Sequence, residues 1–132
     1  MSTLSVTNIT GQPSGNFGVV NAISVADQIG NIREVPIAAK TISYTLVAND
    51  CGKIISTNSA VIIPASIFSN GQNISIYNNS SASITISSAT GVNTYLVGTA
   101  STGSRTLSQN GLVTIICMSA ANTFVISGGG LS

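Results

Sequence analysis

Hydrophobic and polar side chains alternate with a period of two along several short segments of the chain. Residues 41–47 place Ile42, Tyr44 and Leu46 on one face and hydroxyl side chains on the other. Residues 73–77 and 83–87 alternate in the same way. Alternation of this kind is typical of β-strands that have one face on a core and the other in water. It predicts strands over these three segments.

Further strands and the turns between them follow from the rest of the pattern. Continuous apolar runs predict buried strands at 60–63 and 112–118, and shorter runs predict strands at 94–97, 105–108 and 123–127. Only residues 64–68 suggest a helical turn. Asn- and Gly-rich turn sequences recur every eight to fifteen residues from position 49, and the Asn110-Gly111 pair predicts a tight turn between antiparallel strands. The predicted fold class is all-β, an antiparallel β-sandwich of jelly-roll type.

The N-terminal part of the chain has a different pattern. Alternation at 1–7 is interrupted by a Gly/Pro/Asn stretch at 11–16, and a second strand is predicted at 19–25. The predicted organisation is an N-terminal arm with its first strand over 1–30 and a β-sandwich domain over 31–132. Eighteen extended residues span roughly 60 Å, well beyond the roughly 14 Å radius of gyration of a compact chain of this length. Such an arm can reach a neighbouring molecule, although a frayed terminus is the alternative. The candidate assembly contacts in the arm are the apolar residues Leu4, Val6, Ile9 and Phe17.

Charged side chains are scarce, and this scarcity limits the possible functions. The 132 residues include four Lys or Arg, three Asp or Glu and no His, whereas about a quarter of the residues of a soluble domain are charged. Without His, a hydroxyl nucleophile lacks its usual base, and no pair of acids is suggestively placed. We therefore expect no enzyme activity, no catalytic residues, no metal site and no cofactor. Scattered bases give no nucleic-acid footprint. A net charge of +1 gives little repulsion between copies, which favours assembly.

The remaining residues with chemical potential have structural interpretations. Cys51 and Cys117 are the only cysteines, and we expect two free, unreactive thiols, with Cys117 a small buried hydrophobe. Lys53 is expected to form a surface ion pair with Asp50. No apolar run approaches the ~20 residues of a membrane-spanning helix, and the N-terminus lacks a secretion signal. The sequence thus predicts no membrane partner and synthesis in a cytosol.

From residue 31 onward the chain resembles a small β-sandwich module of tailed-bacteriophage virions, found in tail fibres, tailspike tips and small capsid-associated proteins. The resemblance covers about three quarters of the chain and is strongest in its second half. The residues that carry it are Asn31-Ile32-Arg33-x-x-Pro36, Tyr44-Thr45-Leu46-Val47-x-x-Asp50-x-Gly52-Lys53, the Asn78-Asn79 turn, Leu96-x-Gly98-x-x-x-Thr102-Gly103-Ser104-Arg105-Thr106-Leu107-x-x-Asn110-Gly111, and Phe124-x-Ile126-Ser127-Gly128-x-Gly130-Leu131. The chain departs from the family at Cys51, where a small residue such as Ala is usual, and at Phe124, where Trp is frequent.

The resemblance implies a trimeric virion protein made in the cytoplasm of the bacterial host, and it leaves two functions open. The first is a capsid decoration, or cement, protein that binds the major capsid protein as a homotrimer on the outer capsid surface. We favour it because a fibre would need a long repeating shaft. The alternative is a receptor-binding tip of a tail fibre or tailspike that recognises host surface glycans. In that case Tyr77 and Tyr95 are the candidate glycan platform.

Deletion of residues 1–18 tests the predicted arm. We expect the truncated protein to keep its circular dichroism spectrum and to bind undecorated capsids more weakly than the full chain, because the deletion removes all four apolar arm contacts. Binding is measured by co-sedimentation with the particles. Undiminished binding of the truncated chain would contradict the role given to the arm.

Overall fold

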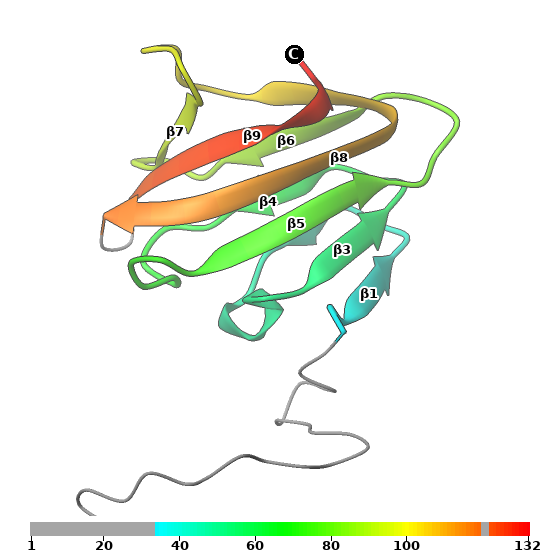
Figure 1. Ribbon diagram of the computed structural model, residues 1–132, viewed down its shortest axis with the longest axis horizontal. Coiled ribbons are helices and arrows are strands. Elements are labelled where there is room, and N and C mark those ends of the chain that lie inside the picture. Colours follow the sequence, from blue (N-terminus) through cyan, green and yellow to red (C-terminus); the bar gives the residue numbers. More distant parts are fainter. Residues whose placement is uncertain (1–33, 120–121) are drawn as a thin grey trace, which may run out of the picture.

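The computed structural model describes residues 34–119 and 122–132 (Figure 1). The candidate arm contacts Leu4, Val6, Ile9 and Phe17 lie outside these residues, as does the whole of the predicted arm segment 1–30. Within the described part of the chain, no helix has both the length and the apolar character needed to cross a membrane.

Nine strands and one short 3-10 turn make up the described fold. The strands are β1 (Ile37–Lys40), β2 (Tyr44–Thr45), β3 (Ile54–Thr57), β4 (Val61–Ile63), β5 (Asn73–Asn78), β6 (Ile84–Ser88), β7 (Asn93–Leu96), β8 (Arg105–Ser119) and β9 (Thr123–Leu131), and the 3-10 turn η1 (Ala48–Asp50) follows β2.

The first six strands form two parallel stacks that the chain builds in alternation. Strands β1, β3 and β5 pair in parallel in one stack, and β2, β4 and β6 pair in parallel in the other. The chain therefore adds one strand to each stack with every circuit. The circuits differ in length: the register advances 17 residues from Ile37 to Ile54 but 21 from Ile54 to Ser75. This variation explains why the sequence shows no repeat of fixed period.

The long strand β8 joins the two stacks. Its residues 105–107 pair antiparallel with β6, and its residues 112–116 pair antiparallel with β5. Strand β9 runs antiparallel along the other edge of β8, and β7 pairs in parallel with β9. The result is a mixed, barrel-like sheet that is nearly closed, with β1 and β2 as the two ends of its strand order. We call the region between these two ends the seam.

The all-β prediction is confirmed, but the strand pairings differ from the antiparallel arrangement that we expected. Five of the eight pairings are parallel. Alternation records which face of a strand is buried, and a half-buried strand alternates in the same way whichever direction its neighbour runs. The pattern therefore predicted the strands without their partners.

One hydrophobic core lies between the stacks. Inward-facing side chains of both stacks, of β8 and of β9 belong to a single cluster of buried residues. The Phe68 and Phe124 rings meet edge to face inside it, with centroids 6.2 Å apart. Cys117 is fully buried in the same cluster, as predicted. The largest fully buried side chains of this cluster are Phe124, Leu46, Ile55, Ile63, Ile74, Ile76, Ile86, Leu107, Ile115 and Ile126.

Several local predictions were wrong. Strands β1 and β3 were not predicted, residues 64–68 form no helix, and the strand expected over 41–47 is limited to Tyr44–Thr45. Asn110-Gly111 lies within β8 rather than in a hairpin turn. Asn110 has a positive φ of 58°, and the pairing of β8 with β9 shifts register between Leu107 and Leu112. The dipeptide therefore bends a continuous strand at a bulge.

Two neighbouring glycines of β9 offer a matched test of this packing. A Cβ at Gly128 would overlap the Leu112 carbonyl oxygen and the Val113 backbone, and its φ of 154° is unfavourable for other residues, whereas a Cβ at Gly129 meets nothing within 4 Å. We expect Gly128→Ala to lower the free energy of unfolding by about 1–3 kcal/mol and Gly129→Ala to change it by less than about 0.5 kcal/mol. Denaturant unfolding of both variants measures this difference. Equal stabilities would contradict the described β8–β9 contact.

Candidate functional site

Lys40, Tyr44 and Asp50 form a cluster of polar side chains at the seam. Asp50 ends η1 and is only 3% exposed. Its Oδ2 accepts hydrogen bonds from the Tyr44 hydroxyl at 2.9 Å and from the Val47 backbone N–H at 2.8 Å. The Lys40 ammonium lies over the Tyr44 ring, 4.0 Å from its centroid. A cation over a ring and a carboxylate at its hydroxyl hold the Tyr44 side chain in place.

The environment of Tyr44 keeps its hydroxyl protonated. Burial, followed by the hydrogen bond to Asp50 and the negative charge of that carboxylate, raises the pKa of Tyr44 to about 12. A phenol with so high a pKa is a hydrogen-bond donor at neutral pH and cannot act as a base or nucleophile there. The cluster is therefore a structural one that attaches η1 to β2.

The arrangement around Asp50 differs from the predicted surface ion pair. Lys53 contacts Asp50 through the backbone, where the Lys53 N–H donates to the Asp50 carbonyl oxygen at 3.0 Å. The Asp50 carboxylate points into the fold and is bound by Tyr44 and Val47. The spacing of Asp50 and Lys53 suggested a charge pair, but the turn buries one of the two side chains. No pattern in the sequence marked this acid as buried.

A second polar residue with a central structural role is Asn78, at the end of β5. Its side chain is fully buried. The amide nitrogen donates to the carbonyl oxygens of Ala82, Leu107 and Ser108 at 2.7–3.0 Å, and the amide oxygen accepts from the backbone N–H of Ser80 at 3.0 Å. Asn78 thus connects β5, the following turn and the middle of β8. The sequence pattern predicts a turn at Asn78 but does not reveal this role, because turn-forming Asn residues are common.

The residues that carry the phage-module resemblance also have structural roles. Arg105 begins β8, and its guanidinium Nη2 donates to the carbonyl oxygen and the hydroxyl of Ser101 at 2.8 and 2.9 Å. Ser108 donates to the Gly130 carbonyl oxygen at 2.9 Å, which joins β8 to the last strand. These contacts shape the turn before β8 and the close β8–β9 packing. They bring no set of reactive groups together.

The candidate glycan residues Tyr77 and Tyr95 lie on one face of the sheet but far apart. Tyr77 faces outward on β5, and Tyr95 faces outward on β7, with β8 and β9 between them. Followed across β9 and β8, the strand pairing brings Tyr95 level with Asn73 of β5. Asn73 lies four residues from Tyr77 along β5. Three strand spacings and four residues place them about 20 Å apart. They therefore do not form one platform.

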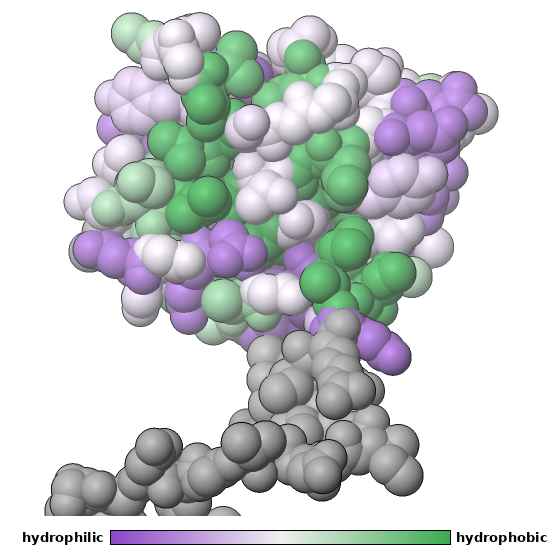
Figure 2. All heavy atoms as spheres, in the orientation of Figure 1, coloured by the Kyte–Doolittle hydropathy of each residue, from purple (hydrophilic) through white to green (hydrophobic). Residues whose placement is uncertain are grey.

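The outward face of β5, β7, β8 and β9, which we call the outer face, is uncharged at its strand positions. Figure 2 shows green, apolar side chains on it among white ones of intermediate hydropathy. Its exposed apolar residues include Leu112 (48% exposed) and Met118 (55% exposed). Hydroxyls bond to each other between the strands, as Ser75 and Thr114 do at 2.9 Å. Its outward residues are Asn73, Ser75, Tyr77, Asn93, Tyr95, Leu112, Thr114, Ile116, Met118, Thr123, Val125 and Ser127.

Metal-binding side chains do not gather in the described part of the chain. Among residues 34–119 and 122–132, no three His, Cys, Asp or Glu side chains lie close enough together to hold an ion. Cys51 and Cys117 are both free thiols. The outer face combines exposed apolar side chains with uncharged polar ones.

Comparison with known proteins adds no assignment. No protein-family model matches the chain, and no curated protein matches it significantly.

Tyr44→Phe tests the seam cluster. Removing a hydroxyl that donates to a buried carboxylate should lower the free energy of unfolding by about 1–3 kcal/mol at pH 7, while Tyr77→Phe, which removes an exposed bond to Asn110, should cost less than about 0.5 kcal/mol. Denaturant unfolding at pH 7 measures both.

The raised pKa of Tyr44 also predicts a pH dependence. Tyrosine in the unfolded chain titrates near pH 10, and Tyr44 in the folded chain near 12. Between these values the folded state binds more protons, so its contribution to stability is complete below about pH 10 and is lost as the pH rises to about 12. Unfolding measured across this window should show a steeper decline for the wild type than for Tyr44→Phe. Parallel declines would show that Tyr44 is not perturbed.

Proposed function

We propose that the protein is a structural component of a tailed-bacteriophage virion, a capsid decoration protein that binds the major capsid protein as a homotrimer on the outer capsid surface. The observation that carries the proposal is the uncharged outer face. The resemblance of residues 31–132 to phage virion modules supplies the type of particle.

An uncharged face of mixed apolar and hydroxyl side chains suits burial against another protein. Removing a charged group from water costs several kcal/mol unless it finds a partner, and the outward strand positions of this face carry no charge. The exposed side chains of Leu112 and Met118 would gain by burial. The centres of protein interfaces are depleted of charge in the same way and enriched in aromatic residues and Met. The outer face has this composition.

The structural use of the polar residues also supports a scaffolding role. Asp50, Asn78 and Arg105 each hold a turn or connect strands. Their hydrogen bonds tie together the seam, the end of β5 and the start of β8. A protein that stabilises a shell gains from such internal connections, because it must keep its shape under mechanical load. Two of the described charged residues, Asp50 and Arg105, thus serve the fold.

A receptor-binding tip is the second candidate. It is favoured by Tyr77 and Tyr95, which are both half-buried and face the same side of the sheet. Aromatic rings of this kind can support a sugar. The separation of about 20 Å means that each tyrosine would have to act as an independent site.

Copy number on purified particles decides between the two candidates. We expect quantitative mass spectrometry of the virus that encodes the chain to find hundreds of copies, near parity with the major capsid protein, and sedimentation velocity to find a trimer. A few to a few dozen copies per particle would reject decoration in favour of a tail-associated tip. A monomer both in solution and on the particle would contradict the proposed trimer.

A further inference from the structure

The outer edge of β1 is open. Among the described residues, β1 is an end of the strand order and pairs with β3 alone. The Ile54 N–H donates to the Pro36 carbonyl oxygen at 2.9 Å, in a parallel register that aligns Ile37 with Ile54. Backbone groups of alternate residues point to opposite sides of a strand. The N–H and C=O groups of Ile37 and Ala39 therefore point away from β3, toward the open edge.

The residues that usually protect an edge strand do not block this edge. Proline and lysine commonly block such pairing, and both are present here. Pro36, however, points its backbone toward β3, so its missing N–H removes no donor from the open edge. Lys40 is the last residue of β1, beyond the outward backbone groups of Ile37 and Ala39, so it does not cover them. The side chains beside the edge are apolar and exposed, 69% for Ile37 and 58% for Val35. Within residues 34–119 and 122–132, nothing blocks this edge from pairing with another strand.

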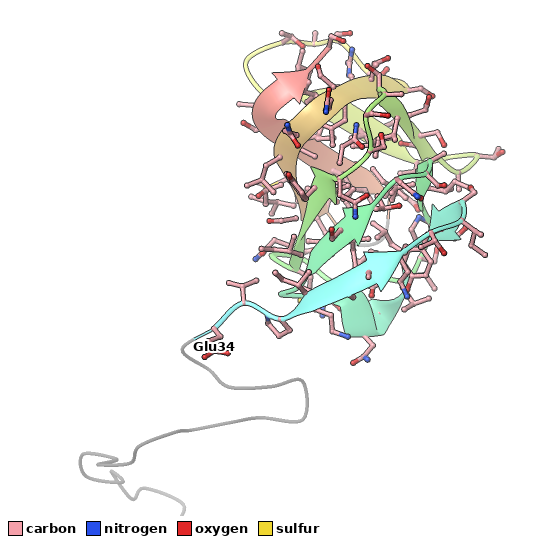
Figure 3. All side chains as sticks on the ribbon, turned by 90° about the vertical axis from the view of Figure 1, so that its right-hand side faces the viewer. Glu34 is labelled. Atoms are coloured by element: carbon pink, nitrogen blue, oxygen red, sulfur yellow. The ribbon has the colours of Figure 1, made fainter. Side chains whose placement is uncertain are left out.

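The charges at the two ends of this segment indicate which strand would fit. Glu34 lies just ahead of β1, at the beginning of the described chain (Figure 3), and Lys40 is the last residue of β1. The two opposite charges are placed symmetrically about Ile37, three residues to either side. In an antiparallel pair of identical strands centred on Ile37, Glu34 of each copy faces Lys40 of the other. The edge is therefore complementary in charge to itself.

We infer that β1 pairs with β1 of a second copy, antiparallel and centred on Ile37. Directly opposed charges of unlike sign stabilise such a pair. Ile37 faces Ile37 of the second copy as a hydrogen-bonded pair, because its N–H and C=O point outward. Pro36 falls at a position that needs no N–H toward the partner. The two sheets then continue as one across the contact.

This contact has twofold symmetry, since the same patch is used by both copies. It is consequently separate from any threefold contact of the proposed trimer. On a particle it would connect neighbouring trimers, and in solution it would double the mass of the assembling unit. The inference requires only a second copy of the chain, so it does not rest on the proposed function.

Charge reversal tests the register. The twofold pair contains two contacts between Glu34 and Lys40, and either Glu34→Lys or Lys40→Glu puts like charges opposite each other at both. We therefore expect the self-association constant of each variant to fall at least about 10-fold. An equimolar mixture of the two variants restores both opposite-charge pairs, one in each direction. Association in the mixture should therefore return to about the wild-type level. Sedimentation velocity measures all four samples, and circular dichroism verifies the fold of each variant.

A cysteine at the centre of the contact provides an independent test. In a hydrogen-bonded antiparallel pair the two Cα atoms lie about 5.5 Å apart, within the range of a disulfide. We expect Ile37→Cys in a Cys51→Ser background to form a disulfide-linked dimer under mild oxidation. Val97→Cys is the matched control, because Val97 is 53% exposed but lies away from β1.

Three results would overturn the inference. The first is no more dimer from Ile37→Cys than from Val97→Cys, which would also be the result if residues 1–33 of the same chain covered the edge. The second is an unchanged association constant in both charge variants. The third is a mixture of the charge variants that associates no better than either alone, which would reject the Ile37-centred register. None of these results depends on the copy number or on a trimer.

Discussion

The rest of the structure depends on the backbone pairing of β8. A stack of parallel strands leaves an open edge at each end, because every strand needs a further neighbour for its hydrogen bonds. Here β8 completes both stacks. It pairs with β6 through its residues 105–107 and with β5 through its residues 112–116. To reach both it must bend between these stretches, where the register shifts. Gly111 lies at the bend, where a Cβ would overlap the Leu107 side chain. The resulting fold has a closed end and an open one.

The buried polar side chains are distributed according to this asymmetry. Asn78 donates to the carbonyl groups of Leu107 and Ser108, next to the bend of β8, and to that of Ala82 in the turn before β6. At the seam, Asp50 accepts from Tyr44 and Val47 where the sheet does not close. Asn78 and Asp50 thus satisfy backbone groups at two places where strand pairing is interrupted or ends. This explains why a chain with so few charged residues places an acid in its interior.

The sequence predicted the strands better than their arrangement. Seven of the nine described strands were recognised from burial alternation or apolar runs, because side-chain periodicity is a local property. Pairing direction is not local, so the parallel stacks were missed. Asn110-Gly111 was mistaken for a hairpin turn because a bulge and a turn can both require positive φ at Asn. For the site, composition indicated an uncharged surface, whereas the separation of Tyr77 from Tyr95 follows from strand order and could not be predicted.

The scarcity of charge changes how association can be selective. Most proteins use surface charges to prevent unwanted edge-to-edge pairing. On the outer face described here, hydroxyls and apolar groups provide attraction without a preferred register. The opposite charges of Glu34 and Lys40 then have a large effect on which register is favoured. A shift of one residue along β1 would separate these charges and would exchange the inward and outward faces of the strand. In the inferred β1 pair, selectivity therefore depends on where the few charges stand along the edge, more than on their number.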